Sequence, residues 1–303
     1  MREYNKIGLI GLGVMGFAMA GNLIKAGHTV VACDVNEERI KMLSDQSKVI
    51  AVKKPYEVLL HTNTVILMLP NSPHVDAVIN GEEGLLSVKS PEDLFIIDMS
   101  SISPDVTREI GGKLEAKGIK FIDGPVSGGE SGAINATLTI MVGGKAAYLE
   151  EAMPIFEILG KKIIHCGDCG AGQTVKVVNQ LMSAINLISM SEAFTLGTKA
   201  GVDPEIMMNV IKGGTGRCWA LEDRMPRILE GEFSAGFKID LHTKDIKLAV
   251  DMAKNMNLPL YATNLVAEIF KTAQVKGLGG YDNSAIIKLY EELGGVEIRK
   301  KKA

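Results

Sequence analysis

Short, continuous apolar runs separated by amphipathic or glycine-rich stretches dominate the first half of the chain. A helical pattern of apolar and polar positions follows the first run as far as residue 26, and it recurs over residues 37–46 and 104–117. The apolar runs are residues 6–10, 29–34, 65–69, 94–98, 119–123, 138–142 and 162–165. Because apolar strands that alternate with helices are typical of a sheet with both faces covered, we predict a mostly parallel, doubly wound α/β domain over residues 1–165.

The pattern becomes helical throughout after Cys166. Pro204 and Pro259 lie near the starts of two helical stretches, where a missing backbone N–H costs little. The helical stretches are residues 174–200, 204–212, 220–230, 241–255, 259–276 and 284–293. The sequence therefore predicts an all-helical second domain over residues 166–303, joined to the first by a long helix at about 171–200.

Composition is typical of a soluble, enzyme-sized protein. The 303 residues are 46% hydrophobic and 23% charged, and the formal net charge is −3 without a long basic block, so neither nucleic-acid nor anionic-membrane binding is expected. No apolar run is long enough to cross a membrane. The first residues are not followed by the apolar region of a signal peptide, so we expect a cytoplasmic protein.

Cys166 and Cys169 have the C-x-x-C spacing of redox and metal sites. The sequence has no second such pair, and His165 does not complete a zinc ligand set. We therefore interpret them as incidental thiols near a glycine turn, and we expect no metal.

A glycine motif follows the first predicted strand and opens the first predicted helix. It has the G-x-G-x-x-G spacing of a Rossmann dinucleotide-binding loop, which is a weak signal except in this strand–helix context, and it consists of Gly11, Leu12, Gly13, Val14, Met15 and Gly16. Asp34 ends the second strand, where a carboxylate accepts hydrogen bonds from the adenosine ribose and repels the 2′-phosphate of NADP. The alternative is that Asp34 caps a helix or lies in a loop. We predict NAD as the cofactor, with NADP possible because Arg39 lies nearby.

Two further strand ends are expected beside the nicotinamide. Leu69, Pro70 and Asn71 end the third strand, and Ser100 and Ser101 follow the fourth. Ligands of open parallel sheets bind beyond the carboxyl ends of the strands. For Asn71 and Ser100, a loop-capping role is nearly as well supported.

Lys176, Asn179 and Gln180 share one face of the long predicted helix. A buried lysine has its pKa lowered toward working pH and suits general acid–base chemistry, whereas a lysine near a helix end often extends to solvent. The segment Ser127, Gly128 and Gly129 offers a hydroxyl and unhindered backbone N–H groups for a carboxylate or phosphate, although a flexible turn explains it equally well.

Four motifs in this order resemble the β-hydroxyacid dehydrogenase family along nearly the whole chain. They are the stretches at residues 8–16, 123–129, 170–180 and 244–249. Residues 68–75, 237–242 and 277–279 are most similar to members that reduce tartronate semialdehyde to glycerate. 3-Hydroxyisobutyrate and 2-(hydroxymethyl)glutarate are the alternative substrates.

The resemblance implies a role for each motif. Lys176 is the catalytic lysine, the serine–glycine–glycine loop holds the carboxylate of a small substrate, and Asn179 and Gln180 orient that substrate. Phe237 and Lys244 close over the nicotinamide. The resemblance also implies a homodimer or homotetramer.

The chain departs from the family pattern at Gly124, Ser101 and Gln180, where alanine, threonine and asparagine are common, and the last weakens substrate assignment. Arg217 and Trp219 lie where members vary with their substrates. Arg217 either pairs with a second substrate carboxylate or is a surface residue. A non-catalytic NAD-binding sensor is the remaining alternative, against which the presence of the lysine argues.

Overall fold

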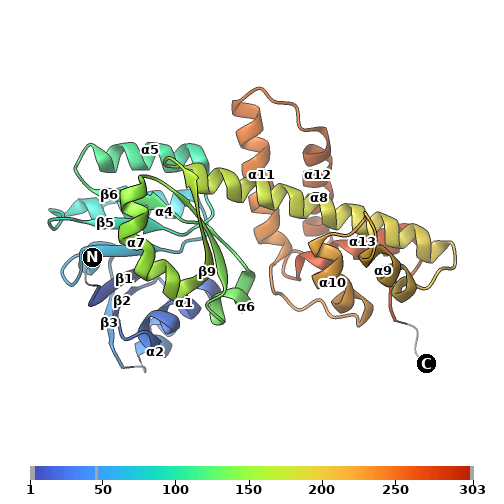
Figure 1. Cartoon of the computed structure of the whole chain (residues 1–303), viewed down its shortest axis with the longest axis horizontal. Helices are drawn as coiled ribbons and strands as arrows, with labels where there is room; N and C mark the ends of the chain where they lie inside the picture. The colour runs from blue at the N-terminus through green and yellow to red at the C-terminus, as the bar shows by residue number, and fades with distance from the viewer. Residues whose placement is uncertain (1–3, 45–46, 301–303) are drawn as a thin grey trace. The chain divides into compact units, whose positions relative to one another are not determined.

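The computed structural model describes residues 4–44 and 47–300, and the chain divides into two compact units. The first unit ends at Lys176 and the second begins at Val177 (Figure 1). The first three residues of the segment compared with a signal peptide, and the predicted helix end at 45–46, lie outside the described residues.

A mixed β-sheet is the framework of the first unit. Over the described residues it has nine strands in the order β3-β2-β1-β4-β5-β6-β8-β7, with β9 paired to β8. All neighbours from β3 to β6 are parallel, β8 runs antiparallel to β6 and β7, and β9 is parallel to β8. The strands are β1 (Lys6–Ile10), β2 (Thr29–Cys33), β3 (Val49–Val52), β4 (Thr64–Leu67), β5 (Phe95–Asp98), β6 (Lys120–Asp123), β7 (Val126–Ser127), β8 (Leu138–Gly143) and β9 (Gly160–Gly167).

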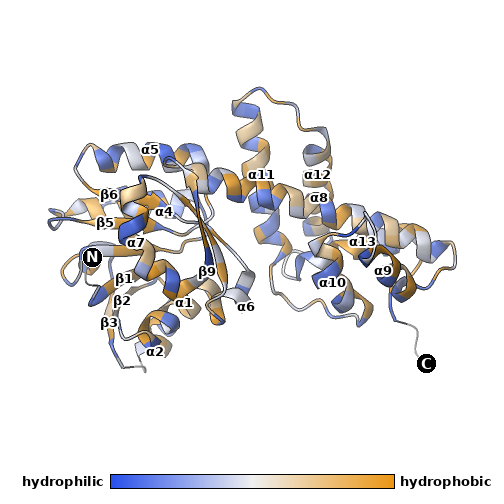
Figure 2. Cartoon of the chain, viewed as in Figure 1, coloured by the Kyte–Doolittle hydropathy of each residue, from blue (hydrophilic) through white to orange (hydrophobic). Residues whose placement is uncertain are grey.

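Successive residues of the central strands β1, β2, β4 and β5 enter hydrophobic cores on opposite faces of this sheet. Leu9 packs in the core that includes α1 (Val14–Lys25) and α7 (Ala146–Leu159). Ile10 packs in the other core, with α4 (Ser72–Asn80) and α5 (Pro104–Glu115). Figure 2 shows the strands as largely hydrophobic. The predicted α/β architecture, a mostly parallel sheet covered on both faces, is confirmed, and it explains why the strands are continuous apolar runs.

The second unit is a set of helices around a core of its own. Helix α8 (Ala171–Lys199) begins in the first unit and continues into the second. Phe194, Phe233 and Phe270 belong to the second core. The other elements are α9 (Pro204–Lys212), α10 (Trp219–Leu229), α11 (Ile239–Asn255), α12 (Tyr261–Val275), η2 (Asn283–Ile286) and α13 (Ile287–Gly294). The predicted helical second domain is confirmed, with one isolated β-bridge between Lys238 and Asp282.

The fold contains elements that the apolar pattern did not predict. The predicted glycine loop after Ser127 continues as the short helix α6 (Gly129–Ile134). Helix α7 has Pro154 in its interior, and α4 carries proline in its first turn. The predicted last helix is divided into η2 and α13. Helix α2 (Glu37–Ser44) lies within a stretch predicted to be helical, whereas α3 (Pro55–Val58), η1 (Leu85–Ser87) and the strands β3 and β7 were not predicted. Within the described ranges, no helix has the length and apolar character that a membrane crossing needs.

Candidate active site

The glycine loop connects β1 to α1 by a tight turn. Gly11 has φ +99°, a conformation that side chains rarely adopt, and a Cβ there would lie 2.3 Å from the Met68 carbonyl oxygen. A Cβ on Gly16 would lie 1.9 Å from the Gly11 carbonyl oxygen. These two glycines are therefore required by the fold of the loop itself.

Gly13 is different, because nothing in the folded chain requires a glycine there. Its φ is −58°, and an added Cβ would meet no atom within 4 Å. Helix α1 begins at the next residue, Val14, and its first turn contains no acidic residue. Open space at the amino terminus of a helix, with free backbone N–H groups, fits a pyrophosphate.

The Asp34 carboxylate is attached directly to this loop. Its Oδ2 accepts a hydrogen bond from the Leu12 N–H, and its Oδ1 accepts one from the Asn36 N–H at 2.7 Å. Asn36, and not Asp34, caps α2, because its Oδ1 accepts from the N–H groups of the first turn of that helix. The Arg39 guanidinium lies over the Phe17 ring, 5.8 Å from its centroid.

The ends of β4 and β5 lie side by side, as expected for adjacent parallel strands. The Leu69 N–H donates to Ser100 Oγ at 2.9 Å. Ser100 is fully buried, so its hydroxyl faces the interior, whereas Ser101 is half-buried. Asn71 caps α4, since its side chain accepts from the His74 N–H. The loop-capping alternative for Asn71 thus describes a contact that is present.

The start of α8 is fixed by Asp123 at the end of β6. Its Oδ1 accepts from the Gly170 N–H at 2.7 Å, and its Oδ2 accepts from the Gln173 N–H at 2.8 Å. Burial raises the pKa of the Asp123 carboxyl, although the two N–H donors act in the opposite direction. A Cβ on Gly172 would lie 2.2 Å from the Met141 carbonyl oxygen, so the first turn of α8 packs against β8. The sequence motif had drawn attention to this aspartate only as the start of a loop.

Lys176 lies one turn further along α8 and is 8% exposed. Its side chain is buried and does not extend into solvent. Gln173, three residues earlier, accepts from the Ile102 N–H at 3.1 Å and donates to the Ser100 carbonyl at 2.7 Å. The same turn of helix therefore also fixes the Ser100–Ser101 segment.

The serine–glycine–glycine segment forms a tight turn before α6. Ser127 is half-buried, and the two glycines have positive φ values of +136° for Gly128 and +60° for Gly129. A Cβ on Gly128 would lie 3.2 Å from the Leu138 side chain, whereas one on Gly129 would meet nothing within 4 Å. A side chain would therefore have open space at Gly129 but would be both strained and crowded at Gly128.

In the second unit, the predicted polar residues of α8 and α11 meet. Gln180 Nε2 donates to Asp245 Oδ2 at 2.7 Å, and Asn179 Nδ2 donates to Gln180 Oε1 at 3.0 Å. Lys244 Nζ lies 3.0 Å from Asp245 Oδ1. Asp245 is buried and contacts both Gln180 and Lys244, although the sequence pattern indicated no role for it.

Phe237 lies in the segment before α11 and packs against a buried histidine. Its ring centroid is 5.3 Å from that of His242, and its backbone N–H donates to Asp282 Oδ2 at 3.0 Å. His242 Nε2 lies 3.1 Å from the Gln180 carbonyl oxygen. Phe237 thus packs against the histidine that contacts the backbone of Gln180.

Arg217 and Trp219 are at the surface of the second unit. Arg217 is 66% exposed and forms an ion pair with Glu222 at 3.0 Å, as the surface-residue alternative predicts. Trp219 is 58% exposed, and the Arg224 guanidinium lies 5.0 Å from its ring centroid. Arg224 in turn donates to Asn283 Oδ1 at 3.2 Å.

The two cysteines of the C-x-x-C pair are free thiols. Burial raises the pKa of Cys169 to about 12, and its Sγ donates to the Thr107 carbonyl at 3.6 Å. Such a thiol is unreactive. In the part of the chain that the structure describes, no three His, Cys, Asp or Glu residues are grouped to hold a metal ion.

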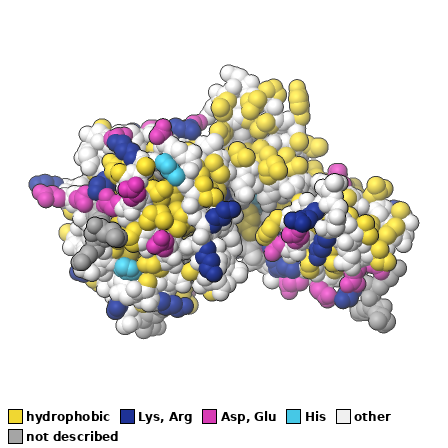
Figure 3. Space-filling view, in the orientation of Figure 1, with side chains coloured by type: hydrophobic (Ala, Val, Ile, Leu, Met, Phe, Trp, Pro, Cys, Tyr) yellow, Lys and Arg dark blue, Asp and Glu magenta, His cyan; other side chains and the backbone are white. Residues whose placement is uncertain are grey.

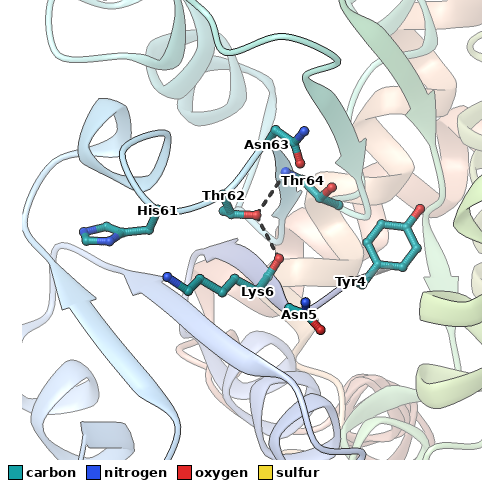
Figure 4. Close-up of a pocket in the computed structure, with 7 residues that line it drawn as sticks. All are labelled: Tyr4, Asn5, Lys6, His61, Thr62, Asn63 and Thr64. Carbon is teal, nitrogen blue, oxygen red and sulfur yellow. Dashed lines mark hydrogen bonds between the residues drawn. The ribbon is translucent and has the colours of Figure 1, made fainter. Parts of the chain in front are cut away.

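A pocket lies at the opposite, amino-terminal ends of β1 and β4 (Figure 4). Thr62 Oγ1 donates to the Lys6 carbonyl at 2.8 Å and accepts from the Thr64 N–H at 3.2 Å. Ligands of open α/β sheets bind beyond the carboxyl ends of the strands, so this pocket is not part of the candidate site.

Comparison with known proteins places the whole chain in one family. Residues 6–167 match the family model for the NAD-binding domain of 6-phosphogluconate dehydrogenase. Residues 170–290 match the model described as NAD-binding of NADP-dependent 3-hydroxyisobutyrate dehydrogenase.

Individual relatives match over nearly their full length. The chain is 41% identical to 2-(hydroxymethyl)glutarate dehydrogenase of Eubacterium barkeri, covering 98% of this chain and 99% of that protein. It is 39% identical to 2-hydroxy-3-oxopropionate reductase of Escherichia coli (strain K12), covering 94% and 97%. The solved structure of Mycobacterium tuberculosis 3-hydroxyisobutyrate dehydrogenase with L-serine matches with a TM-score of 0.87 and 33% identity, covering 95% of this chain and 99% of that one.

The fold and the glycine loop define an NAD(P)-dependent oxidoreductase. The chain belongs to the β-hydroxyacid dehydrogenases, the family that includes 3-hydroxyisobutyrate dehydrogenase.

Proposed function

We propose that this dehydrogenase interconverts a short β-hydroxyacid and its semialdehyde, with reduction of tartronate semialdehyde to glycerate as the favoured reaction. The buried Lys176, on the same helix face as Asn179 and Gln180, is the observation that carries the proposal. The similarity to the Escherichia coli reductase supports the substrate. The ion pair of Arg217 with Glu222 also supports a substrate with one carboxylate, because it occupies the arginine that a second carboxylate would need.

3-Hydroxyisobutyrate is an alternative with one carboxylate. 2-(Hydroxymethyl)glutarate is the other alternative, favoured by the 41% identity to the Eubacterium barkeri enzyme. It requires Arg217 to leave Glu222, or another cation to take its place.

We assign the proton transfer to Lys176. Its ammonium Nζ donates a proton to the oxygen of the aldehyde during reduction, and the neutral amine removes the hydroxyl proton during oxidation. The Ser127 hydroxyl and the N–H groups of Gly128 and Gly129 bind the substrate carboxylate. Bound NAD(H) supplies or accepts the hydride.

Most of the cofactor contacts are assigned to the loop and strand ends of the first unit. The space at Gly13 and the N–H groups at Val14 and Met15 would hold the pyrophosphate, while Asp34 would bind the ribose hydroxyls and favour NAD over NADP. Ser100 would act indirectly, by holding Leu69. The remaining contacts to the nicotinamide side are assigned to Pro70, Asn71, Ser101, Phe237 and Lys244.

Kinetics of Lys176→Ala test this function. With NADH and a panel of the three semialdehydes, we expect kcat to fall by about 10²- to 10⁴-fold while the Kd for NADH stays unchanged. Lys199→Ala is the matched control, because Lys199 is an exposed lysine of the same helix. Wild-type turnover by folded Lys176→Ala would exclude the assigned proton transfer. Binding of NADH without reduction of any semialdehyde would favour the sensor instead.

We further propose that residues 1–165 bind the cofactor and residues 166–303 serve substrate binding and assembly into a homodimer or homotetramer. Apolar side chains exposed at the end of α11 and in the first turns of α12 support assembly, among them Met256, Tyr261 and Leu265. Figure 3 shows hydrophobic side chains gathered on this part of the surface. Light scattering after size-exclusion chromatography tests this, and a monomer at micromolar concentration would contradict it.

A further inference from the structure

The orientation of the Gln180 side-chain amide is fixed by Asp245. A carboxylate only accepts hydrogen bonds, so the amide nitrogen of Gln180 must be the atom that faces Asp245 Oδ2 at 2.7 Å. Gln180 and Asp245 are 6% and 4% exposed, so water does not compete for this bond. The other carboxylate oxygen, Oδ1, forms an ion pair with Lys244 Nζ at 3.0 Å.

The orientation of Gln180 in turn determines that of Asn179. With its nitrogen held by Asp245, Gln180 presents Oε1 to its neighbour and accepts from Asn179 Nδ2 at 3.0 Å. Asn179 is exposed, and its NH₂ group is turned toward Gln180. Its carbonyl oxygen is therefore the atom turned away from this pair, and an oxygen acceptor suits the hydroxyl of a β-hydroxyacid.

The backbone of Gln180 is held by a second chain of hydrogen bonds whose direction is also fixed. Arginine only donates, so Asn283 Oδ1 faces Arg224 Nε at 3.2 Å, and Asn283 Nδ2 faces His242 Nδ1 at 3.0 Å. His242, which is fully buried, then carries its proton on Nε2 and donates it to the Gln180 carbonyl. The residue that orients Asn179 is thus attached to α11 at both its side chain and its backbone.

We propose that Asp245 is a positioning residue that acts through Gln180 to present the Asn179 oxygen to the substrate hydroxyl. Asp245 does not itself touch the substrate. This inference rests on the proposed function, in which Asn179 contacts the substrate. It accounts for a buried carboxylate that the proposed chemistry does not otherwise use.

A double-mutant cycle between Asp245→Asn and Asn179→Ala tests the proposal. In Asp245→Asn an NH₂ group replaces one carboxylate oxygen, so either Gln180 or Lys244 loses its acceptor. We expect kcat/KM for the hydroxyacid to fall by about 10- to 100-fold, as for misplaced substrates in general. In the Asn179→Ala background the same change should cost less than about threefold, because the residue it orients is gone. Any change in kcat/KM that Asp245→Asn causes through Lys244 is the same in both backgrounds, so it cancels when the two effects are compared.

The matched control is Asp240→Asn. Asp240 lies in the same helix and also accepts from a glutamine, Gln274 Nε2 at 2.6 Å, but Asp240 is exposed and its partner belongs to α12, not to the Asn179–Gln180 pair. We expect its kcat/KM to stay within about twofold of wild type. As an equilibrium readout, the Kd of the hydroxyacid is measured by the fluorescence of Trp219, the one tryptophan of the sequence, and should rise in Asp245→Asn.

The outcomes separate the inference from the proposed function. Equal effects of Asp245→Asn in both backgrounds, or wild-type kinetics in that variant, would overturn the inference while leaving the proposed function in place. Wild-type kinetics in Asn179→Ala would remove the substrate contact of Asn179 and the inference with it. If Asp245→Asn does not fold, Gln180→Met replaces it, because methionine has neither the N–H donor to Asp245 nor the oxygen acceptor for Asn179. The effect of Gln180→Met on kcat/KM must then also be smaller in the Asn179→Ala background than in wild type.

Discussion

Alanine substitutions at Gly13 and Gly16 should separate cofactor binding from folding, although both glycines belong to one motif. At Gly16 the new methyl group would overlap the Gly11 carbonyl, 1.9 Å away. Backbone must move to accommodate it, and overpacking of this kind costs about 1–3 kcal/mol. For a unit of this size, each kcal/mol lowers Tm by about 2–4 °C.

Gly13→Ala should leave stability nearly unchanged. The φ of −58° is favourable for alanine, and no atom lies within 4 Å of the new methyl group. The lower entropy of the unfolded chain stabilises the variant by about 0.4–1 kcal/mol. The poorer helix cap that alanine provides offsets this by a similar amount, roughly 0.5–1 kcal/mol. The methyl group instead enters the space assigned to the pyrophosphate, so we expect the Kd for NADH to rise at least tenfold, about 1.4 kcal/mol.

Thermal melts without cofactor and NADH titrations followed by fluorescence measure the two effects on each variant. Gly21→Ala is a control, because Gly21 lies in α1 and its added Cβ also meets nothing within 4 Å. Gly13→Ala with wild-type affinity for NADH would refute placement of the pyrophosphate at this loop. An unchanged Tm in Gly16→Ala would refute the close approach of α1 to the turn at Gly11.

Three further predictions concern carboxylates and thiols of the first unit. Asp34→Ser removes the charge expected to repel a 2′-phosphate, so the ratio of kcat/KM with NADPH to that with NADH should rise about tenfold or more; an unchanged ratio would contradict the assignment. Asp123→Asn leaves one of two N–H groups of α8 without its acceptor and should cost about 1–2 kcal/mol. Burial raises the pKa of Asp123 above its ordinary 3.8, so the stabilisation that its carboxyl contributes is complete below pH 3.8 and is lost as pH rises through the raised pKa. Thermal melts at several pH values should therefore show the stability advantage of wild type over Asp123→Asn shrinking as pH rises. A difference in stability that stays constant with pH would be evidence against this pKa shift. Finally, because the pKa of Cys169 is raised to about 12, iodoacetamide at pH 8 should modify it only after unfolding in urea, as mass spectrometry would show; rapid labelling of the native protein would contradict its burial.

The apolar pattern predicted the architecture because both faces of the sheet are covered. Strands such as β5, whose residues are all buried, have no polar positions to interrupt them, and this makes them easy to recognise. Helix α7 was not predicted because Pro154 in its interior normally marks a helix end. Helix α6 was not predicted because its short, glycine-rich sequence is typical of a turn.

The candidate site was predictable where one segment of chain carries the chemistry. The glycine loop and the Lys176 helix are of this kind, since spacing along the chain sets their geometry. The role of Asp245 depends on Gln180, 65 residues away in sequence, and that contact is set by the packing of α8 against α11. The contact of Asp123 with the start of α8 could not be predicted for the same reason. The hydrophobic periodicity of an element indicates which of its faces is buried, but it does not identify the residues that this face contacts elsewhere in the chain.

The division of the chain at Lys176 has a consequence for its biosynthesis. Each compact unit is one uninterrupted stretch of sequence, and the turn of α8 held by Asp123 belongs to the first. All contacts that shape the glycine loop are therefore available once residue 176 has left the ribosome. At about 5–20 residues per second, translation of the remainder takes on the order of 10 s, which is long compared with the folding of most domains. The first unit can thus form before the second has been made, and a nascent chain stalled after residue 176 has left the ribosome should already contain the complete dinucleotide loop.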